Sequence, residues 1–287
     1  MTTPEAPLVS IITPAYNAAP YLDDLLRSVE SQDYPRLEHI VIDDGSTDGG
    51  ATIELLRRHP HVRWWSRSNR GQYATMNEGF RAATGDFITA ISADDRYVDG
   101  TAISALAAGL IEHPDWDVAY GYTLHADGDA RALPAQPYQR YPPWMLRYNL
   151  GFIFHCSLLV RRARLVADGL FFDESLRYIG DADWMARLQM QHYRFGRIER
   201  FVAAYRHHSQ QVSAIASAEQ SAHVLRCAEH ERFHRHHGTS RLLRRLLLAY
   251  GTFQQRRVKT LAAWRRGGGA EVGGLVLAWL RRRYGRD

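Results

Sequence analysis

The first 95 residues alternate short apolar runs with segments of helical spacing, and this alternation restricts the fold more than any other feature. The apolar runs expected to form buried strands are 8–12, 39–42, 62–65 and 86–91. The segments with helical spacing begin after Pro20 and cover 52–59 and 72–83. Such alternation predicts an α/β fold in which parallel strands are joined by right-handed crossovers.

Ligands of parallel sheets bind beyond the carboxyl ends of the strands, so the segments that follow the strands are the expected site. These segments are 14–17, 43–46, 66–71 and 92–95. Two of them carry acidic pairs, Asp43-Asp44 and Asp94-Asp95, which are costly to desolvate unless a cation or ligand hydrogen bonds offset the charge. Turn formation explains either pair alone, but two pairs on one edge favour a binding site.

The second half of the chain is less regular. Residues 134–143 contain four prolines and are expected to form a loop or an extended connector. A strand is expected over 152–160, and helices are expected over 183–192 and 217–236. The last of these helices is rich in histidine, but its interleaved arginines disfavour a metal site and favour a solvated face.

Three separated motifs resemble those of family 2 glycosyltransferases with the GT-A fold: 9–17 (VSIITPAYN), 41–48 (VIDDGSTD) and 93–95 (ADD). The stretch 69–80 (NRGQYATMNEGF) is similar to the linker of that family. The resemblance runs from about Leu8 to about Ser213 and implies a nucleotide-binding, mostly parallel sheet flanked by helices.

The resemblance also implies a domain division. The catalytic domain would cover 1–215, with a nucleotide-sugar half over about 1–100 and an acceptor half over about 101–215. A helical, basic C-terminal region would cover 216–287.

The nucleotide-binding residues implied by the resemblance are Pro14, Tyr16, Asn17, Asp43, Asp44, Arg70, Gln72 and Asp94. Tyr16 would stack on the base and Pro14 would offer its backbone carbonyl; a tyrosine packed within the loop is the alternative for Tyr16. Asp44 would accept a hydrogen bond from a pyrimidine N3–H, which favours a UDP- or dTDP-sugar donor.

Asp94 and Asp95 resemble the acidic motif that holds Mn²⁺ or Mg²⁺ against the donor phosphates. Asp95 would bind the metal and Asp94 the ribose or the metal's water shell, although either could be the main ligand. Ser92 stands where the family usually has Asp or Asn. His208 matches a late histidine that reaches the metal or the phosphates in some such enzymes; a polar loop is the alternative.

Asp181, in the stretch 178–188, matches the position of the family's catalytic base. An inverting transfer needs a carboxylate that takes the proton of the acceptor hydroxyl. The alternative is an N-cap at Asp181 with Asp183 in the first helical turn, and both roles can hold together. On the expected strand over 152–160, His155 is expected to be a satisfied core residue and Cys156 a small buried side chain.

The formal charge of +5 divides unevenly along the chain. From Arg241 onward there are 12 Arg and Lys against 2 Asp and Glu, which leaves 24 against 29 in the first 240 residues. Two basic-apolar segments, 241–257 and 272–283, suit interfacial helices on anionic lipid; packing on the domain or on a partner is the alternative. Binding of nucleic acid is not expected, because the tail has few aromatic side chains to stack on bases.

Neither apolar run of the tail is long enough to span a bilayer, and no signal peptide is evident at the first residues. Two cysteines, Cys156 and Cys227, are too few for a disulfide framework and fit a reducing compartment. A cytoplasmic protein is therefore expected, at most peripheral at the inner face of the cell membrane.

The resemblance implies a metal-dependent, inverting glycosyltransferase of the hexosyltransferase type. It would act in bacterial surface polysaccharide or glycan biosynthesis, on a glycan or lipid-linked acceptor. The alternative is a catalytically silent nucleotide-binding or membrane-associated scaffold of the same fold. The oligomeric state is left open.

Overall fold

The computed structural model describes residues 5–133, 143–148, 153–211 and 220–238, together with 242, 243, 245, 246 and 250. Within them, eight strands form one mixed sheet in the order β3-β2-β1-β4-β7-β6-β8-β5. The strands are β1 (Val9–Ala15), β2 (Leu37–Asp43), β3 (Arg63–Ser66), β4 (Phe87–Ala90), β5 (Arg96–Tyr97), β6 (Val118–Ala126), β7 (Leu158–Arg161) and β8 (Phe195–Arg206). The four predicted strands are confirmed, and β3, β2, β1 and β4 pair in parallel. The sheet becomes mixed beyond β4, because β7 runs antiparallel to both β4 and β6.

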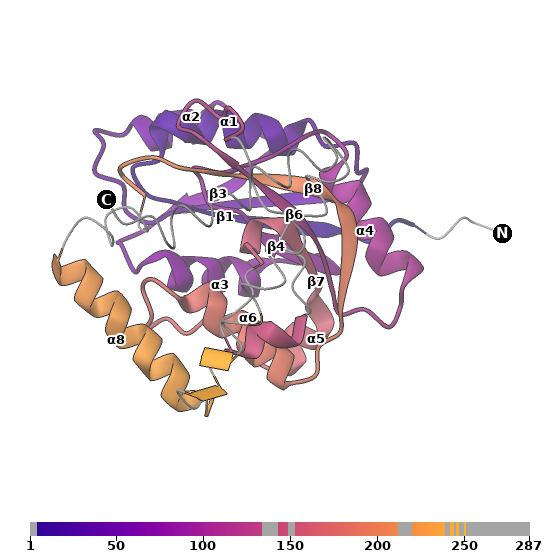
Figure 1. The fold of residues 1–287 in the computed structure, drawn as a ribbon. Helices are drawn as coiled ribbons and strands as arrows, with labels where there is room; N and C mark the ends of the chain where they lie inside the picture. Colours follow the sequence, from indigo (N-terminus) through magenta and orange to yellow (C-terminus); the bar gives the residue numbers. More distant parts are fainter. Residues whose placement is uncertain are drawn as a thin grey trace, which may run out of the picture.

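Helices cover both faces of the sheet (Figure 1). One layer holds α1 (Ala19–Glu30), α2 (Ala51–Arg57) and α4 (Ala102–Glu112); the other holds α3 (Gln72–Ala82), α5 (Arg162–Ala167), α6 (Gly180–Met190) and α8 (Gln220–His236). Successive side chains of β1 point to the two helix layers in turn. Ile11 packs in the core under α1, and Ile12 packs in the core under α3. The sheet is therefore buried on both sides, as its continuous apolar strands predict.

The expected strand over 152–160 is wrong in its first part. Residues His155–Ser157 form a 3₁₀ turn, η2, closed by a hydrogen bond from Ser157 N to Phe154 O of 2.9 Å, and β7 begins only at Leu158. The turn orients His155 differently from a strand residue. A second 3₁₀ segment, η1 (Pro143–Tyr148), follows the connector, most of which lies outside the described residues.

The histidine-rich helix α8 packs against the domain more closely than a solvated helix would. Phe233 is buried in the core shared with α3 and α6, and Arg232 donates to Ser175 Oγ at 3.0 Å. His237, just after the helix, is buried against Asp183 with 3.3 Å between Nε2 and Oδ1. Other residues of the helix, such as Arg235 and His236, are exposed, as the predicted solvated face requires.

The basic tail segments 241–257 and 272–283 lie almost wholly outside the described residues. Among the helices that the structure describes, none combines the length and apolar character needed to cross a bilayer.

The buried His39 on β2 should make the free energy of unfolding depend on pH in the acid range. Its Nε2 lies 3.0 Å from Thr13 Oγ1, and burial, reinforced by His61 and His59, lowers the pKa of His39 to about 3. Because the unfolded chain takes up this proton near pH 6.5, stability is lost as pH falls from there toward 3, by at most about 1.4 kcal/mol per pH unit. His39→Gln, which cannot titrate, should flatten this loss in denaturant unfolding measured between pH 7 and 5. Parallel curves for the two proteins would contradict the assignment.

Candidate active site

The four segments that follow the parallel strands meet at one edge of the sheet, as the sequence predicts. Asn17 N donates to Ser46 Oγ at 2.8 Å, which joins the first segment to the second. Arg67 N donates to Asp43 O at 3.2 Å, which joins the second to the third. Gln72, at the start of α3, reaches Ser92 Oγ with its Nε2 at 3.2 Å, and so connects to the fourth.

Asp44 organises the loop between β3 and α3. Its buried carboxylate accepts from Arg70 N at 2.8 Å and Gly71 N at 2.9 Å, and from the Arg67 guanidinium. A carboxylate offers about four lone-pair positions, so three donors leave one for a ligand N–H. The arrangement is compatible with the expected contact to a base.

Arg67 is a site residue that the sequence analysis did not single out. It donates to Asp44, to Glu78 Oε2 at 2.9 Å and to Thr75 Oγ1 at 2.8 Å. Burial lowers the pKa of Arg67, but the hydrogen bonds and charges of Glu78 and Asp44 outweigh this and raise it. Its position directly after the third strand, on the predicted ligand edge, is the sequence feature that could have identified it.

In the first two segments Tyr16 is exposed, whereas Asn17 and Asp43 hold the segments together. Tyr16 has 51% of its surface exposed, so it is not packed within the loop. Pro14 is buried within β1, opposite Ile42. Asn17 Oδ1 accepts from Thr47 N at 2.7 Å, and the Asp43 carboxylate accepts from Ser46 and from Ser66, so these side chains fasten loops together.

Arg70 extends from the same loop toward two carboxylates. Its guanidinium lies 3.6 Å from Glu78 Oε2 and 3.5 Å from Glu174 Oε2 while remaining half exposed. These loose, partly solvated pairs leave the side chain able to meet an anionic ligand.

The Asp94-Asp95 pair is held by the far end of β8. Asp95 Oδ1 accepts from Arg206 N at 3.0 Å, and Asp94 Oδ2 lies 2.9 Å from His208 Nε2, so all three predicted metal-site residues come together. Asp95 Oδ2 is buried without a hydrogen-bond partner among the residues that the structure describes. Burial, and next the charge of Asp94, raise the pKa of Asp95 well above its usual range.

These observations fit a divalent cation. A buried carboxylate oxygen without a partner, beside a second carboxylate, is stabilised by a cation that neutralises both. Carboxylate oxygens are also the ligands that Mg²⁺ and Mn²⁺ prefer.

Asp181 lies beside His155, which in turn contacts the same site. The buried imidazole of His155 has its Nε2 3.1 Å from Ser92 Oγ and its Nδ1 3.9 Å from Asp181 Oδ2. Nδ1 has no hydrogen-bond partner among the described residues, and 3.9 Å is too long for a hydrogen bond to Asp181, so the expectation of a satisfied core histidine is wrong on this side of the ring. Ser92 therefore connects the acidic segment to His155, and its hydroxyl also meets Gln72.

The start of α6, which carries Asp181, is fixed from two sides. Glu229 of α8 accepts from three successive backbone amides, Arg177 N at 2.7 Å, Tyr178 N at 2.9 Å and Ile179 N at 3.2 Å. On the other side the ring of Tyr73 packs so closely that a Cβ on Gly180 would lie 2.5 Å from it.

The N-cap alternative for Asp181 is wrong, because α6 begins earlier than the predicted residue 183. The cap residue is Ile179, without a side-chain cap bond, and the Asp181 carboxylate instead accepts from the adjacent Ala182 N at 2.8 Å. Asp183 does lie in the first turn, where burial raises its pKa but bonds to His237 and Arg187 outweigh this and lower it.

Comparison with known sequences gives a family match. Residues 10–166 match the family described as Glycosyl transferase family 2. An uncharacterized glycosyltransferase of Rickettsia typhi is 31% identical over 192 residues, which are 64% of this chain and 60% of that protein. The O-antigen biosynthesis protein RfbC of Myxococcus xanthus is 31% identical over 170 residues, 57% of this chain and 13% of that protein. The chain thus spans less than two thirds of either relative.

Solved structures share the fold. S. aureus TarS 1–349 in complex with UDP-GlcNAc has a TM-score of 0.59 at 18% identity, over 97% of this chain and 92% of that one. The mannosyltransferase PcManGT from Pyrobaculum calidifontis, in complex with GDP-Man and Mn²⁺, has a TM-score of 0.59 at 19% identity, over 98% and 82%. These likenesses confirm the predicted GT-A fold.

Proposed function

The chain belongs to glycosyl transferase family 2, and we propose that it is a metal-dependent, inverting enzyme that moves a sugar from a UDP- or dTDP-sugar to an acceptor hydroxyl. One observation carries the proposal: His155 bonds Ser92, two residues before Asp94, and lies with its Nδ1 3.9 Å from the Asp181 carboxylate. The proposed proton acceptor and the proposed diphosphate-binding carboxylate pair therefore lie near one another.

In the proposed complex the nucleotide binds across the ends of β1 and β2. Tyr16 stacks on the base, which its exposure supports, and Asp44 uses its remaining acceptor position for the base N3–H. Arg67 fixes the Asp44 carboxylate, and Arg70 and Gln72 face the diphosphate side. TarS has been crystallised with UDP-GlcNAc, which agrees with a uridine donor.

The proposed cation is Mn²⁺ or Mg²⁺, held by Asp95 and Asp94, with His208 behind Asp94. Bound there, it would neutralise the charge that builds up on the leaving diphosphate. The Mn²⁺ complex of PcManGT supports this choice of metal.

Asp181 is the proposed base. It takes the proton of the acceptor hydroxyl while the hydroxyl oxygen bonds to the sugar C1, and the bond from C1 to the diphosphate oxygen breaks on the opposite face. The His155 ring lies beside the Asp181 carboxylate, 3.9 Å from Nδ1 to Oδ2, and makes no hydrogen bond to it.

The proposed acceptor is a glycan or a lipid-linked glycan of the bacterial surface, because a relative is named for O-antigen biosynthesis. Apolar side chains exposed on α8, Val224 and Leu225, precede the basic region beyond Arg241. Together they suit peripheral attachment to an anionic membrane.

A donor panel tests the proposal. Calorimetric binding and slow hydrolysis of UDP-, dTDP- and GDP-sugars should be measured with Mn²⁺, with Mg²⁺ and with chelator. Binding and hydrolysis of a UDP- or dTDP-sugar that require the metal are expected. No binding of any donor with Mn²⁺ would refute the proposal, and metal-dependent binding without turnover would indicate a silent nucleotide-binding module.

Glu229 is expected to act as a positioning residue for Asp181. Glu229→Ala removes the acceptor for three amides at the start of α6, and a resulting shift of about 1 Å in Asp181 would lower kcat about 10²-fold. Donor affinity should stay unchanged, because the nucleotide contacts lie elsewhere. Glu229→Gln should recover part of the rate through its carbonyl oxygen, whereas the exposed Glu231→Ala on the same helix serves as the control. Equal kcat for Glu229→Ala and the control would contradict the role.

A further inference from the structure

A second cluster of potential metal ligands lies at the opposite ends of the parallel strands from the proposed active site. Glu30 is the last residue of α1, and His59 and His61 lie in the connection between α2 and β3, on either side of Pro60. Because α1 runs back from the end of β1, and β3 starts at Arg63, this cluster lies near the amino ends of the parallel strands. The proposed active site lies at their carboxyl ends.

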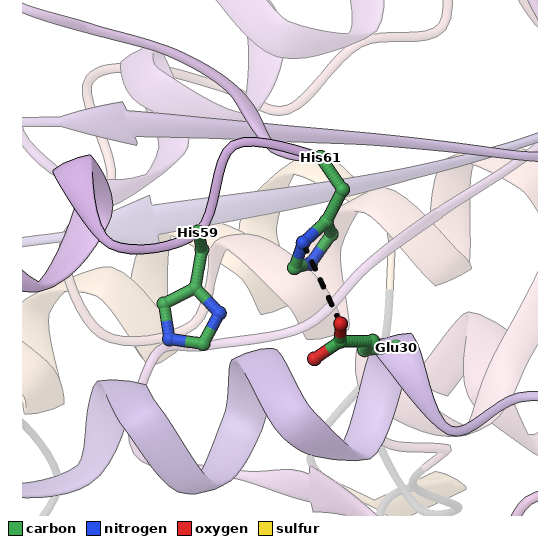
Figure 2. Close-up of side chains that lie close together, drawn as sticks. All are labelled: Glu30, His59 and His61. Atoms are coloured by element: carbon green, nitrogen blue, oxygen red, sulfur yellow. Dashed lines mark ion pairs between the residues drawn. The ribbon is translucent and has the colours of Figure 1, made fainter.

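The three side chains face a common space. One ligand atom from each lies within 4.8 Å of the other two, and His61 Nδ1 is 3.9 Å from Glu30 Oε1 (Figure 2). His59 is largely buried, whereas Glu30 is 59% exposed in its side chain and free to adjust. The proline between the two histidines restricts the backbone that carries them.

A carboxylate behind the cluster orients one of the ligands. His59 Nε2 lies 3.2 Å from Asp23 Oδ1, so the other ring nitrogen, Nδ1, is the one available toward His61 and Glu30 (Figure 2). Arg27 Nε holds the second oxygen of Asp23 at 2.8 Å. Histidines that bind metals commonly donate their other N–H to such a carboxylate, which fixes the tautomer and the ring orientation.

We propose that Glu30, His59 and His61 bind a divalent transition-metal ion of the Zn²⁺ class, with water as the fourth ligand. Two imidazoles and one carboxylate suit Zn²⁺, Ni²⁺ or Cu²⁺, whereas Mg²⁺ and Mn²⁺ prefer the all-oxygen pair Asp94-Asp95. Bonds of about 2.0–2.1 Å bring tetrahedral ligand atoms closer together than 4.8 Å, and the exposed Glu30 side chain can supply that movement. The ion would tie the end of α1 to the α2–β3 connection, away from the reaction.

Zinc titration of the full chain tests the site. Calorimetry with Zn²⁺ in excess Mg²⁺, which competes for the Asp94-Asp95 pair, should show a high-affinity site in the wild type that is weakened in the ligand variants below. His61→Gln and Glu30→Gln should each weaken it by more than about tenfold, and Asp23→Asn by about tenfold through loss of the oriented His59. His113→Gln, an exposed histidine stacked on Trp116, is the matched control and should bind as the wild type does.

Thermal unfolding gives an independent readout that does not involve catalysis. Zn²⁺ should raise Tm in the wild type and in His113→Gln, because an ion that binds only the folded state stabilises it, and should raise it less in His61→Gln and Glu30→Gln. Their Tm without metal verifies that these two exposed substitutions leave the fold intact. Equal isotherms and equal Tm shifts for the wild type and both ligand variants, or no zinc bound by the wild type, would overturn the proposal.

Discussion

Asp181→Asn is expected to bind the donor sugar nucleotide as the wild type does and to lose transfer, with kcat reduced about 10²- to 10⁴-fold. The amide has nearly the same shape as the carboxylate but cannot take the acceptor's proton. The start of α6 should be unchanged, because Glu229 rather than Asp181 accepts from the amides before the helix. Calorimetric donor binding and steady-state transfer, measured on the same preparation, separate the two effects.

Asp183→Asn, two residues further along α6, provides the contrast. Asp183 bonds Arg187 at 2.7 Å and His237 at 3.3 Å, so its substitution should lower Tm, an effect not expected for Asp181→Asn. Normal transfer by Asp181→Asn would show that another group is the base. Loss of donor binding would instead mean that Asp181 contributes to the nucleotide site.

The sequence predicted the nucleotide half of the fold well because its elements are set by local patterns. Buried parallel strands such as 39–42 are continuous apolar runs, and the helices between them have regular apolar spacing. The ligand edge follows from that topology alone, since parallel strands with right-handed crossovers end on the same side.

The acceptor half was harder because its site depends on contacts between distant segments. The bend at His155–Ser157 interrupts an apolar run that has a strand pattern, and only the tertiary structure brings His155 between Ser92 and Asp181. Glu229 lies about 50 residues from the amides that it binds. No local pattern indicates such a contact.

Ser92 illustrates how tertiary contacts change an interpretation. The residue departs from the family's acidic motif, yet its hydroxyl meets both Gln72 and His155. An aspartate there would bring a third negative charge beside Asp94 and Asp95. The serine therefore agrees with a site in which the residue before the acidic pair bonds His155 instead of adding a third carboxylate.

Asp95→Asn is expected to abolish metal-dependent donor binding and to lower transfer by about 10²-fold or more, because a bound divalent ion contributes several kcal/mol. Without metal the same substitution should leave Tm unchanged or raise it. It removes a carboxyl group that burial and the charge of Asp94 make costly to ionise and whose Oδ2 lacks a hydrogen-bond partner in the described chain. The amide oxygen can still accept from Arg206 N.

This pair of effects distinguishes a metal ligand from a structural aspartate, whose removal would lower Tm and activity together. Asp115→Asn, an exposed aspartate paired with Arg194, changes the net charge equally and should affect neither quantity. Titrating Mn²⁺ into each protein with UDP present measures the metal dependence, and thermal unfolding in chelator measures the stability. Unchanged Mn²⁺ dependence in Asp95→Asn would shift the metal-binding role to Asp94 and His208, which lie 2.9 Å apart.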